Sequence, residues 1–154
     1  MNENVSIRCE LEREGYFVYK CIGTSMKPII RPNKDVVVIE HRSSERLRKF
    51  DAVLFVRPDG TYILHRILKI NRNTYWIAGD NCYTGEIVDD SQIIGKMTKI
   101  IRNNKEIAVD SILYKVYLVL WCAPYHLRFA MIYTRRKSII LLKRWKRKVV
   151  RWLR

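Results

Sequence analysis

Between residues 16 and 109 the chain alternates short apolar runs with turn-forming sequence. Val, Ile, Tyr and Phe dominate the runs, and these residue types favour strands. The pattern predicts strands over Tyr16–Cys21, Asp35–Glu40, Asp51–Val56, Thr61–Ile70, Thr74–Ala78, Ile93–Ile101 and Glu106–Val109. Two stretches, Pro58-Asp59-Gly60 and Asn71-Arg72-Asn73, are typical of hairpin turns. This spacing indicates a mainly β fold of coiled, mostly antiparallel sheets.

Beyond Asp110 the pattern changes. Ser111–Cys122 is apolar and fits either a helix or a buried strand, and Pro124 should break it. Over Arg135–Arg154 apolar side chains recur at spacings of three and four, which predicts an amphipathic helix. Its apolar stripe consists of Ile139, Leu142, Trp145, Val149 and Leu153. We therefore expect a β domain over residues 1–110 and a helical tail over residues 111–154.

The charge of the protein is concentrated in this tail. The 154 residues carry a net charge of +15, and residues 111–154 contribute 12 Lys/Arg and no acid. A basic amphipathic helix can dock on the β domain with its charges solvated, or bind an anionic membrane surface through Arg135–Arg154. Nucleic-acid binding is the least favoured use, because no recognisable reading motif accompanies the charge.

The sequence predicts neither an exported protein nor a membrane span. Residues 1–15 are polar, and the longest apolar run, Val116–Tyr125, is much shorter than the roughly 20 residues that cross a bilayer. We expect a cytoplasmic location, peripheral at the inner face of the cytoplasmic membrane if the tail binds lipid. The cysteines are scattered without a Cys-x-x-Cys, so they predict neither a zinc site nor a disulfide framework. They are Cys9, Cys21, Cys82 and Cys122.

Candidate chemistry lies in motifs that place a serine, a histidine and acids in order. The motifs are Gly23-Thr24-Ser25-Met26-Lys27-Pro28, Leu64-His65-Arg66, Gly79-Asp80-Asn81 and Asp89-Asp90. A serine hydroxyl is a poor nucleophile at neutral pH unless an imidazole takes its proton and a carboxylate orients that imidazole. Each residue alone is more often a turn or core residue. Their combination makes them candidates.

In this order the four motifs resemble the signal peptidase I family and the related self-cleaving repressor peptidases, over about Tyr16 to Ile101. Bacterial members usually use a lysine as general base, whereas the endoplasmic-reticulum and archaeal type uses a histidine, here His65. The resemblance implies a serine endopeptidase in which Ser25 is the nucleophile and Asp90 orients His65. It also implies an extended substrate strand beside the serine and no metal or organic cofactor. The supporting residues would be Asp80, Asp89 and Met26.

The chain departs from the family pattern at four places. Pro32-Asn33-Lys34-Asp35 and Phe50-Asp51 stand where the family usually has Gly-Asp, and Asn33 can adopt the left-handed conformation of a glycine. The extra residues 82–88 leave open whether Asp80, Asp89 or Asp90 orients the histidine. Gly23 replaces a hydroxyl that helps some relatives bind the oxyanion, so this task would pass to backbone N–H groups, most simply that of Ser25.

Two functions of other classes also fit the sequence. The chain could be a non-catalytic peptide- or membrane-binding adaptor that keeps a peptidase fold, or a regulator that binds nucleic acid through its tail. The presence of Ser25, His65 and Asp90 together favours the enzyme, because a retired site has no reason to keep all three. The substrate is left open between an exported precursor, a small cytosolic precursor peptide and the chain itself.

Overall fold

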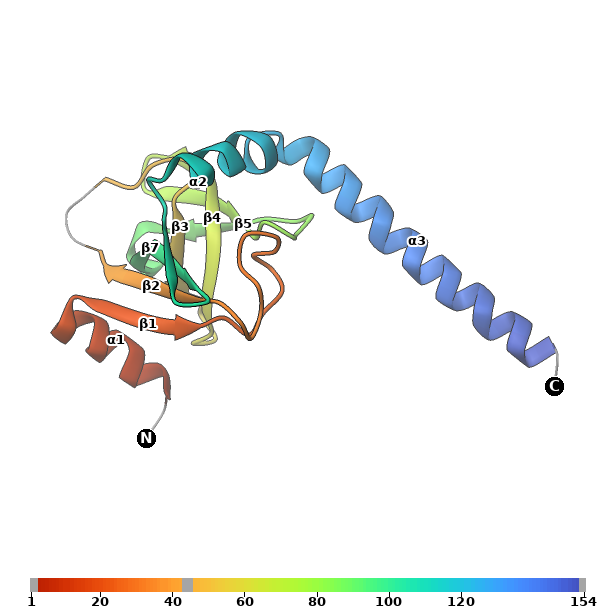
Figure 1. Cartoon of the computed structure of the whole chain (residues 1–154), viewed down its shortest axis with the longest axis horizontal. Helices are drawn as coiled ribbons and strands as arrows, with labels where there is room; N and C mark the ends of the chain where they lie inside the picture. The colour runs from red at the N-terminus through yellow and green to blue at the C-terminus, as the bar shows by residue number, and fades with distance from the viewer. Residues whose placement is uncertain (1–2, 43–45, 153–154) are drawn as a thin grey trace.

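The computed structural model describes residues 3–42 and 46–152, and its strands form one curled, antiparallel half-barrel sheet (Figure 1). This confirms the predicted fold class, and each of the seven predicted strands is present. The sheet order is β1 (Tyr16–Lys20), β2 (Val36–His41), β7 (Ile93–Arg102), β3 (Ala52–Val56), β4 (Tyr62–Asn71), β5 (Thr74–Ala78) and β6 (Glu86–Asp89), and β8 (Lys105–Ala108) pairs with β7.

Two elements were not predicted from the sequence. Strand β6 is a short edge strand in which only Val88 is buried, so it carries almost no apolar signal. Helix α1 (Glu3–Glu14) is mostly polar and joins the core through Leu11, which is completely buried, and the partly buried Ile7. Both elements depend on contacts with the rest of the sheet rather than on a pattern of their own.

The turns that depart from the family pattern adopt the backbone conformation a glycine would supply. Asn33 has φ +60° and Phe50 has φ +75°, both in the left-handed region. The Asn33 N–H donates to the Cys21 carbonyl and the Phe50 N–H donates to the Ile67 carbonyl, each at 2.8 Å. An aromatic residue is rare in this region, and Phe50 is held there by packing against Leu68 and its neighbours.

Strand β4 crosses the core and is buried on both faces. Leu64 belongs to the cluster that includes Met26, Ile39 and Ile100, whereas Ile67 belongs to the cluster around Phe55. This agrees with the alternation of side chains along an extended strand. Because β4 lies between β3 and β5, the backbone that carries His65 is held on both sides.

The C-terminal segment is helical throughout. Helix α2 (Ile112–Tyr117) begins at Ser111, whose hydroxyl accepts from the Tyr114 N–H, and continues as a π-helical segment, η2 (Leu118–Cys122). Pro124 marks the start of helix α3 (Tyr125–Trp152). The predicted tail helix is thus confirmed and begins ten residues earlier than expected. Of its predicted apolar stripe, Leu153 lies outside the described residues.

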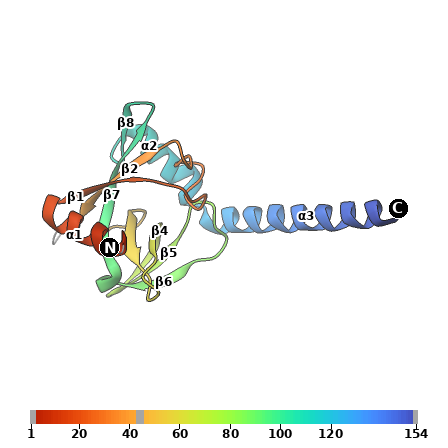
Figure 2. The ribbon, with the colours of Figure 1, turned by 90° about the horizontal axis from the view of Figure 1, so that it is seen from below.

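The packing shows no break at residue 110. Tyr114, Cys122, Tyr125 and Ile132 are buried against the β domain, and Tyr125 makes an edge contact with Trp76 of β5. The C-terminal part of α3 projects away from the β domain (Figures 1 and 2). Within the described chain, no helix combines the length and apolar character needed to cross a bilayer.

Candidate active site

Ser25 lies half-buried in the loop between β1 and β2. Met26 and Ile30 anchor this loop in the core, and the Ile30 N–H donates to the Met26 carbonyl at 3.1 Å. Buried Asp35 fixes its far end by accepting from the Arg31 N–H at 2.8 Å and from Arg102 Nη2 at 2.6 Å. Met26 therefore supports the serine by packing.

The ionised carboxylate of Asp35 and the side chain of Arg102 connect the loop to the sheet. Burial alone would raise the pKa of Asp35, but hydrogen bonds from Arg102 and Arg31 lower it to about 2. The same Arg102 Nη2 also donates to the Ile29 carbonyl at 2.6 Å. The loop that contains Ser25 is thus held by the core contacts of Met26 and Ile30 and by the hydrogen bonds of Arg102.

His65 lies in β4 with only 9% of its surface exposed. Burial lowers the pKa of its imidazole below the ordinary 6.5, and the nearby charge of Glu86 opposes part of this shift. The imidazole is therefore neutral at pH 7. A neutral histidine is the form that can accept a proton from a serine hydroxyl.

Gly79 brings the serine loop and the histidine together. A Cβ on this residue would stand 2.7 Å from the Ser25 carbonyl oxygen and 3.0 Å from His65 Nε2. Only a residue without a side chain lets the three segments approach this closely. The Asn81 N–H then donates to the same Ser25 carbonyl at 2.7 Å. Nε2 is thus the imidazole nitrogen that faces the serine loop.

Cys82 also borders this point, with its sulfur 2.8 Å from the position of a Gly79 Cβ. No sequence motif indicated that Cys82 would lie there. Burial raises the pKa of the Cys82 thiol. The thiol is therefore protonated at neutral pH and is a poor competitor for the role of nucleophile.

The other imidazole nitrogen faces Glu86. His65 Nδ1 lies 3.6 Å from Glu86 Oε1, beyond hydrogen-bond distance, and although it is buried it has no hydrogen-bond partner among the residues that the structure describes. Arg57 holds the carboxylate from the far side, with Nη2 donating to Oε1 at 2.6 Å and Nε to Oε2 at 2.8 Å. Glu86 was missed in the sequence because it lies in the segment 82–88 that matches no motif.

The structure places Asp90 away from His65. Asp90 accepts from the Tyr75 hydroxyl and pairs with Arg42, each at 2.7 Å, and the Arg42 hydrogen bond is the main reason its pKa is lowered. Its N–H donates to the Asn73 carbonyl, before the start of β5, whereas Gly79 follows the end of β5. The five residues of β5 separate the two sites, roughly 16 Å of extended chain.

Asp89 has a local structural role. It precedes the short 3₁₀ turn Asp90–Gln92, and its N–H donates to Gln92 Oε1 at 2.9 Å. Asp89 is exposed. Neither acid of the Asp-Asp motif therefore reaches the histidine in this structure.

Asp80 supports the site through buried hydrogen bonds. It is completely buried and receives two hydrogen bonds from Arg66, at 2.8 and 2.6 Å. The helical segment adds two more contacts, because the Tyr117 hydroxyl donates to Asp80 Oδ2 at 2.8 Å and Trp121 Nε1 donates to the Asp80 carbonyl at 3.1 Å. Asp80 thus joins β4 to residues 112–122, and the neighbouring Asn81 makes the hydrogen bond to the loop that holds Ser25.

These side chains are of the types used in acyl transfer. Among residues 3–42 and 46–152, no group of three or more His, Cys, Asp or Glu side chains is placed to hold a metal ion. The arrangement instead offers a hydroxyl, a neutral imidazole whose Nε2 faces the hydroxyl's loop, and a carboxylate near Nδ1. No protein-family model and no curated protein matches the chain.

Proposed function

We propose that this protein is a serine endopeptidase of the signal peptidase I type, with Ser25 as nucleophile and His65 as general base. The observation that carries the proposal is the close approach of three segments at Gly79. The Ser25 carbonyl oxygen and His65 Nε2 both lie within 3.0 Å of the position that a Cβ on Gly79 would occupy. The lowered pKa of His65 adds support, because it keeps the imidazole neutral at pH 7.

In the proposed reaction, His65 Nε2 takes the hydroxyl proton as Ser25 Oγ bonds to the scissile carbonyl carbon. The carbonyl electrons move to oxygen, and the Ser25 N–H stabilises this oxyanion. That N–H donates no hydrogen bond to the backbone among the described residues, so it is free for this task. His65 then gives its proton to the leaving amine, and water hydrolyses the acyl-enzyme by the reverse proton path.

Glu86 is the carboxylate that we propose to orient His65, in place of Asp90. Its distance of 3.6 Å from Nδ1 is longer than a hydrogen bond, but catalytic hydrogen bonds are often long in the free enzyme and shorten with substrate. Its charge also raises the pKa of His65 against the effect of burial. Such a carboxylate stabilises the imidazolium that forms during the reaction.

The substrate would be a peptide bound in extended form along the chain that leads to Ser25. Residues 21–23 follow β1 without pairing in the sheet, and the Ile22 side chain is 68% exposed. An unpaired extended segment can accept a peptide strand by backbone hydrogen bonds. The scissile bond would then lie beside Ser25.

A membrane surface is the proposed place of action. Helices α2 and η2 turn one apolar face to solvent, including Leu113 and Leu120 at 81% and 71% exposure, while Tyr114 and Trp121 face the domain. The projecting part of α3 adds exposed Leu142 and Trp145 among basic side chains. Apolar groups beside many cations suit the interface of an anionic membrane.

Labelling with a fluorophosphonate probe tests the proposed enzyme. The full-length protein should be labelled, and Ser25→Ala should abolish both labelling and peptide cleavage. Ser138→Ala, which removes an exposed serine of α3, is the matched control and should keep both. Equal labelling of the Ser25→Ala and wild-type proteins would reject the peptidase and favour the non-catalytic adaptor.

A further inference from the structure

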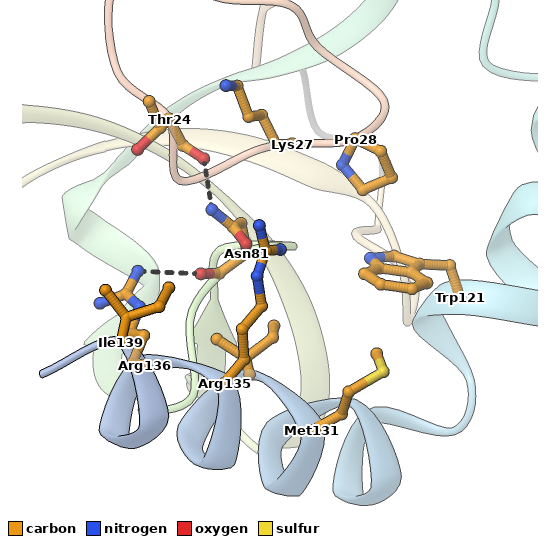
Figure 3. Close-up of a pocket in the computed structure, with 10 residues that line it drawn as sticks. Thr24, Lys27, Pro28, Asn81, Trp121, Met131, Arg135, Arg136 and Ile139 are labelled. Carbon is orange, nitrogen blue, oxygen red and sulfur yellow. Dashed lines mark hydrogen bonds between the residues drawn. The ribbon is translucent and has the colours of Figure 1, made fainter. Parts of the chain in front are cut away.

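A cavity of about 600 Å³ lies between the serine loop and helix α3 (Figure 3). Thr24, Lys27 and Pro28, on either side of Ser25, form one wall. Residues 131–139 of α3 form the opposite wall, and Asn81 and Trp121 lie between them. A cavity of this size can hold one or two side chains of a bound peptide. It adjoins the proposed site without including His65 or Glu86.

The cavity combines an apolar surface with cations. Pro28, Trp121, Met131, Ile132 and Ile139 supply the apolar part. The charged lining consists of Lys27, Arg135 and Arg136, and no acid lines the cavity. Among the described residues, neither Lys27 nor Arg135 has an ion-pair partner. Figure 3 shows Arg135 extending from α3 toward Asn81.

The wall formed by α3 is fixed in position. Arg136 donates to the Asn81 carbonyl at 3.3 Å and stacks on the Tyr83 ring at 5.2 Å. Tyr83 in turn makes an edge contact with Tyr133, and Ile132 is buried. Arg135 therefore presents its charge from a supported helix turn. A cation at this position, without an ion-pair partner among the described residues, favours an anionic ligand because a bound anion would neutralise its charge.

We propose that this cavity binds an acidic residue of the peptide substrate, located within a few residues of the scissile bond. Arg135 is the specificity-determining residue, and the apolar lining accepts a neighbouring aliphatic side chain. This inference rests on the proposed peptidase activity. A peptide is the occupant we favour because Thr24 and Lys27, which line the cavity, lie on either side of the proposed nucleophile in the chain.

Cleavage-site profiling of a peptide library by the full-length protein tests the inference. Bonds cut by the wild type should be enriched about two- to fivefold in Asp or Glu within three residues of the cut, the effect of a partly solvated ion pair. Arg135→Glu should replace this preference with one for Lys or Arg. The matched control Arg144→Glu, with the same charge change on the same helix outside the cavity, should keep the acidic preference.

A binding measurement separates this inference from the peptidase assignment. The acetylated and amidated pentapeptide Leu-Glu-Leu-Glu-Leu and its Lys counterpart serve as probes for the full-length Ser25→Ala protein. Tighter binding of the acidic probe, reversed by the added Arg135→Glu, would support the cavity even if no cleavage were detected. Cleavage without acidic preference, or equal binding of both probes, would overturn the inference and leave the peptidase proposal intact. Arg135-dependent displacement of the acidic probe by phosphatidylglycerol vesicles would overturn it in favour of a lipid ligand.

Discussion

His65 Nδ1 lies 3.6 Å from Glu86 Oε1, while Arg57 donates to both oxygens of that carboxylate. The histidine thus faces an ion pair whose two members act on it in opposite directions. The charge of Glu86 raises the pKa of His65 and the charge of Arg57 lowers it, while burial lowers it more than either. This relationship makes the proposed role of Glu86 measurable.

The first prediction concerns the pH dependence of kcat/KM. Protonated His65 is inactive as a base, so activity should rise with pH through its pKa, below 6.5 in the wild type. Glu86→Gln removes a charge that raises this pKa, so the acid limb should move to lower pH while the plateau falls by about tenfold or more. Arg57→Gln should move the limb to higher pH.

Asp90→Asn is the control for this assignment. Asp90 pairs with Arg42 and Tyr75 and does not influence the pKa of His65, so the acid limb of this variant should stay in place. A limb that moves in Asp90→Asn and not in Glu86→Gln would return the orienting role to Asp90.

A second prediction concerns the close approach at Gly79. In Gly79→Ala the added methyl group would stand 2.7 Å from the Ser25 carbonyl oxygen, a backbone atom that cannot rotate away. The serine loop must then shift relative to His65, and a displacement near 1 Å can cost about a hundredfold in rate. Gly23→Ala is the control for kcat, because its added Cβ meets nothing within 4 Å. Gly23 lies in the segment proposed to bind the peptide, so the comparison uses kcat and not KM.

Both glycine variants should remain folded, as judged by circular dichroism. The kcat for one substrate at one pH should fall in Gly79→Ala and change little in Gly23→Ala. Full activity of Gly79→Ala would mean that Ser25 and His65 do not work together across this contact.

The strands were predictable because each carries a dense run of β-branched and aromatic residues, and the motifs located Ser25 and His65 through their local spelling. The orienting acid was not predictable. Glu86 and Asp90 are four residues apart in the sequence, which corresponds to roughly 13 Å along an extended chain. The choice between them depends on the pairing of Glu86 with Ile77, near the Gly79 end of β5. Strand register of this kind is a tertiary property.

The contacts that the helical segment 111–122 makes with the site could not be predicted for a similar reason. The stretch 111–122 fitted a helix or a strand, and nothing in its sequence indicated that Tyr117 and Trp121 would donate hydrogen bonds to Asp80. The predicted division at residue 110 follows the change in charge. The packing instead continues to Ile132, so the first part of the tail helps to position the loop that holds Ser25.

A third prediction compares the two buried arginines near Asp80. Arg66 makes two short hydrogen bonds to this carboxylate, whereas Arg128 lies 3.6 Å from it, and its Nε and Nη2 have no hydrogen-bond partner within residues 3–42 and 46–152. Arg66→Met would remove both of its hydrogen bonds to the buried carboxylate of Asp80 and should cost about 3–5 kcal/mol of unfolding free energy. Arg128→Met removes a poorly paired buried charge and should cost clearly less.

Urea unfolding of the two variants under identical conditions measures this difference. The exposed pair of Arg8 and Glu12 provides a third comparison, since Arg8→Met should change the unfolding free energy by less than about 1 kcal/mol. Equal losses for Arg66→Met and Arg128→Met would show that Asp80 depends on both arginines.

The last prediction concerns the proposed membrane surface. The full-length protein should bind phosphatidylglycerol vesicles more tightly than phosphatidylcholine vesicles, and added salt should weaken the binding, because residues 111–154 hold 12 basic side chains and no acid. Trp145→Glu should weaken binding by about tenfold or more even at low salt, since it also removes a 63% exposed indole that would enter the interface.

Thr134→Glu makes the same charge change at an exposed position of α3 without removing a large apolar group, so its effect should be smaller and vanish at high salt. Sedimentation with vesicles measures both. Equal losses for the two variants would mean that charge alone holds the protein at the surface, with α3 lying above the lipid rather than in its interface.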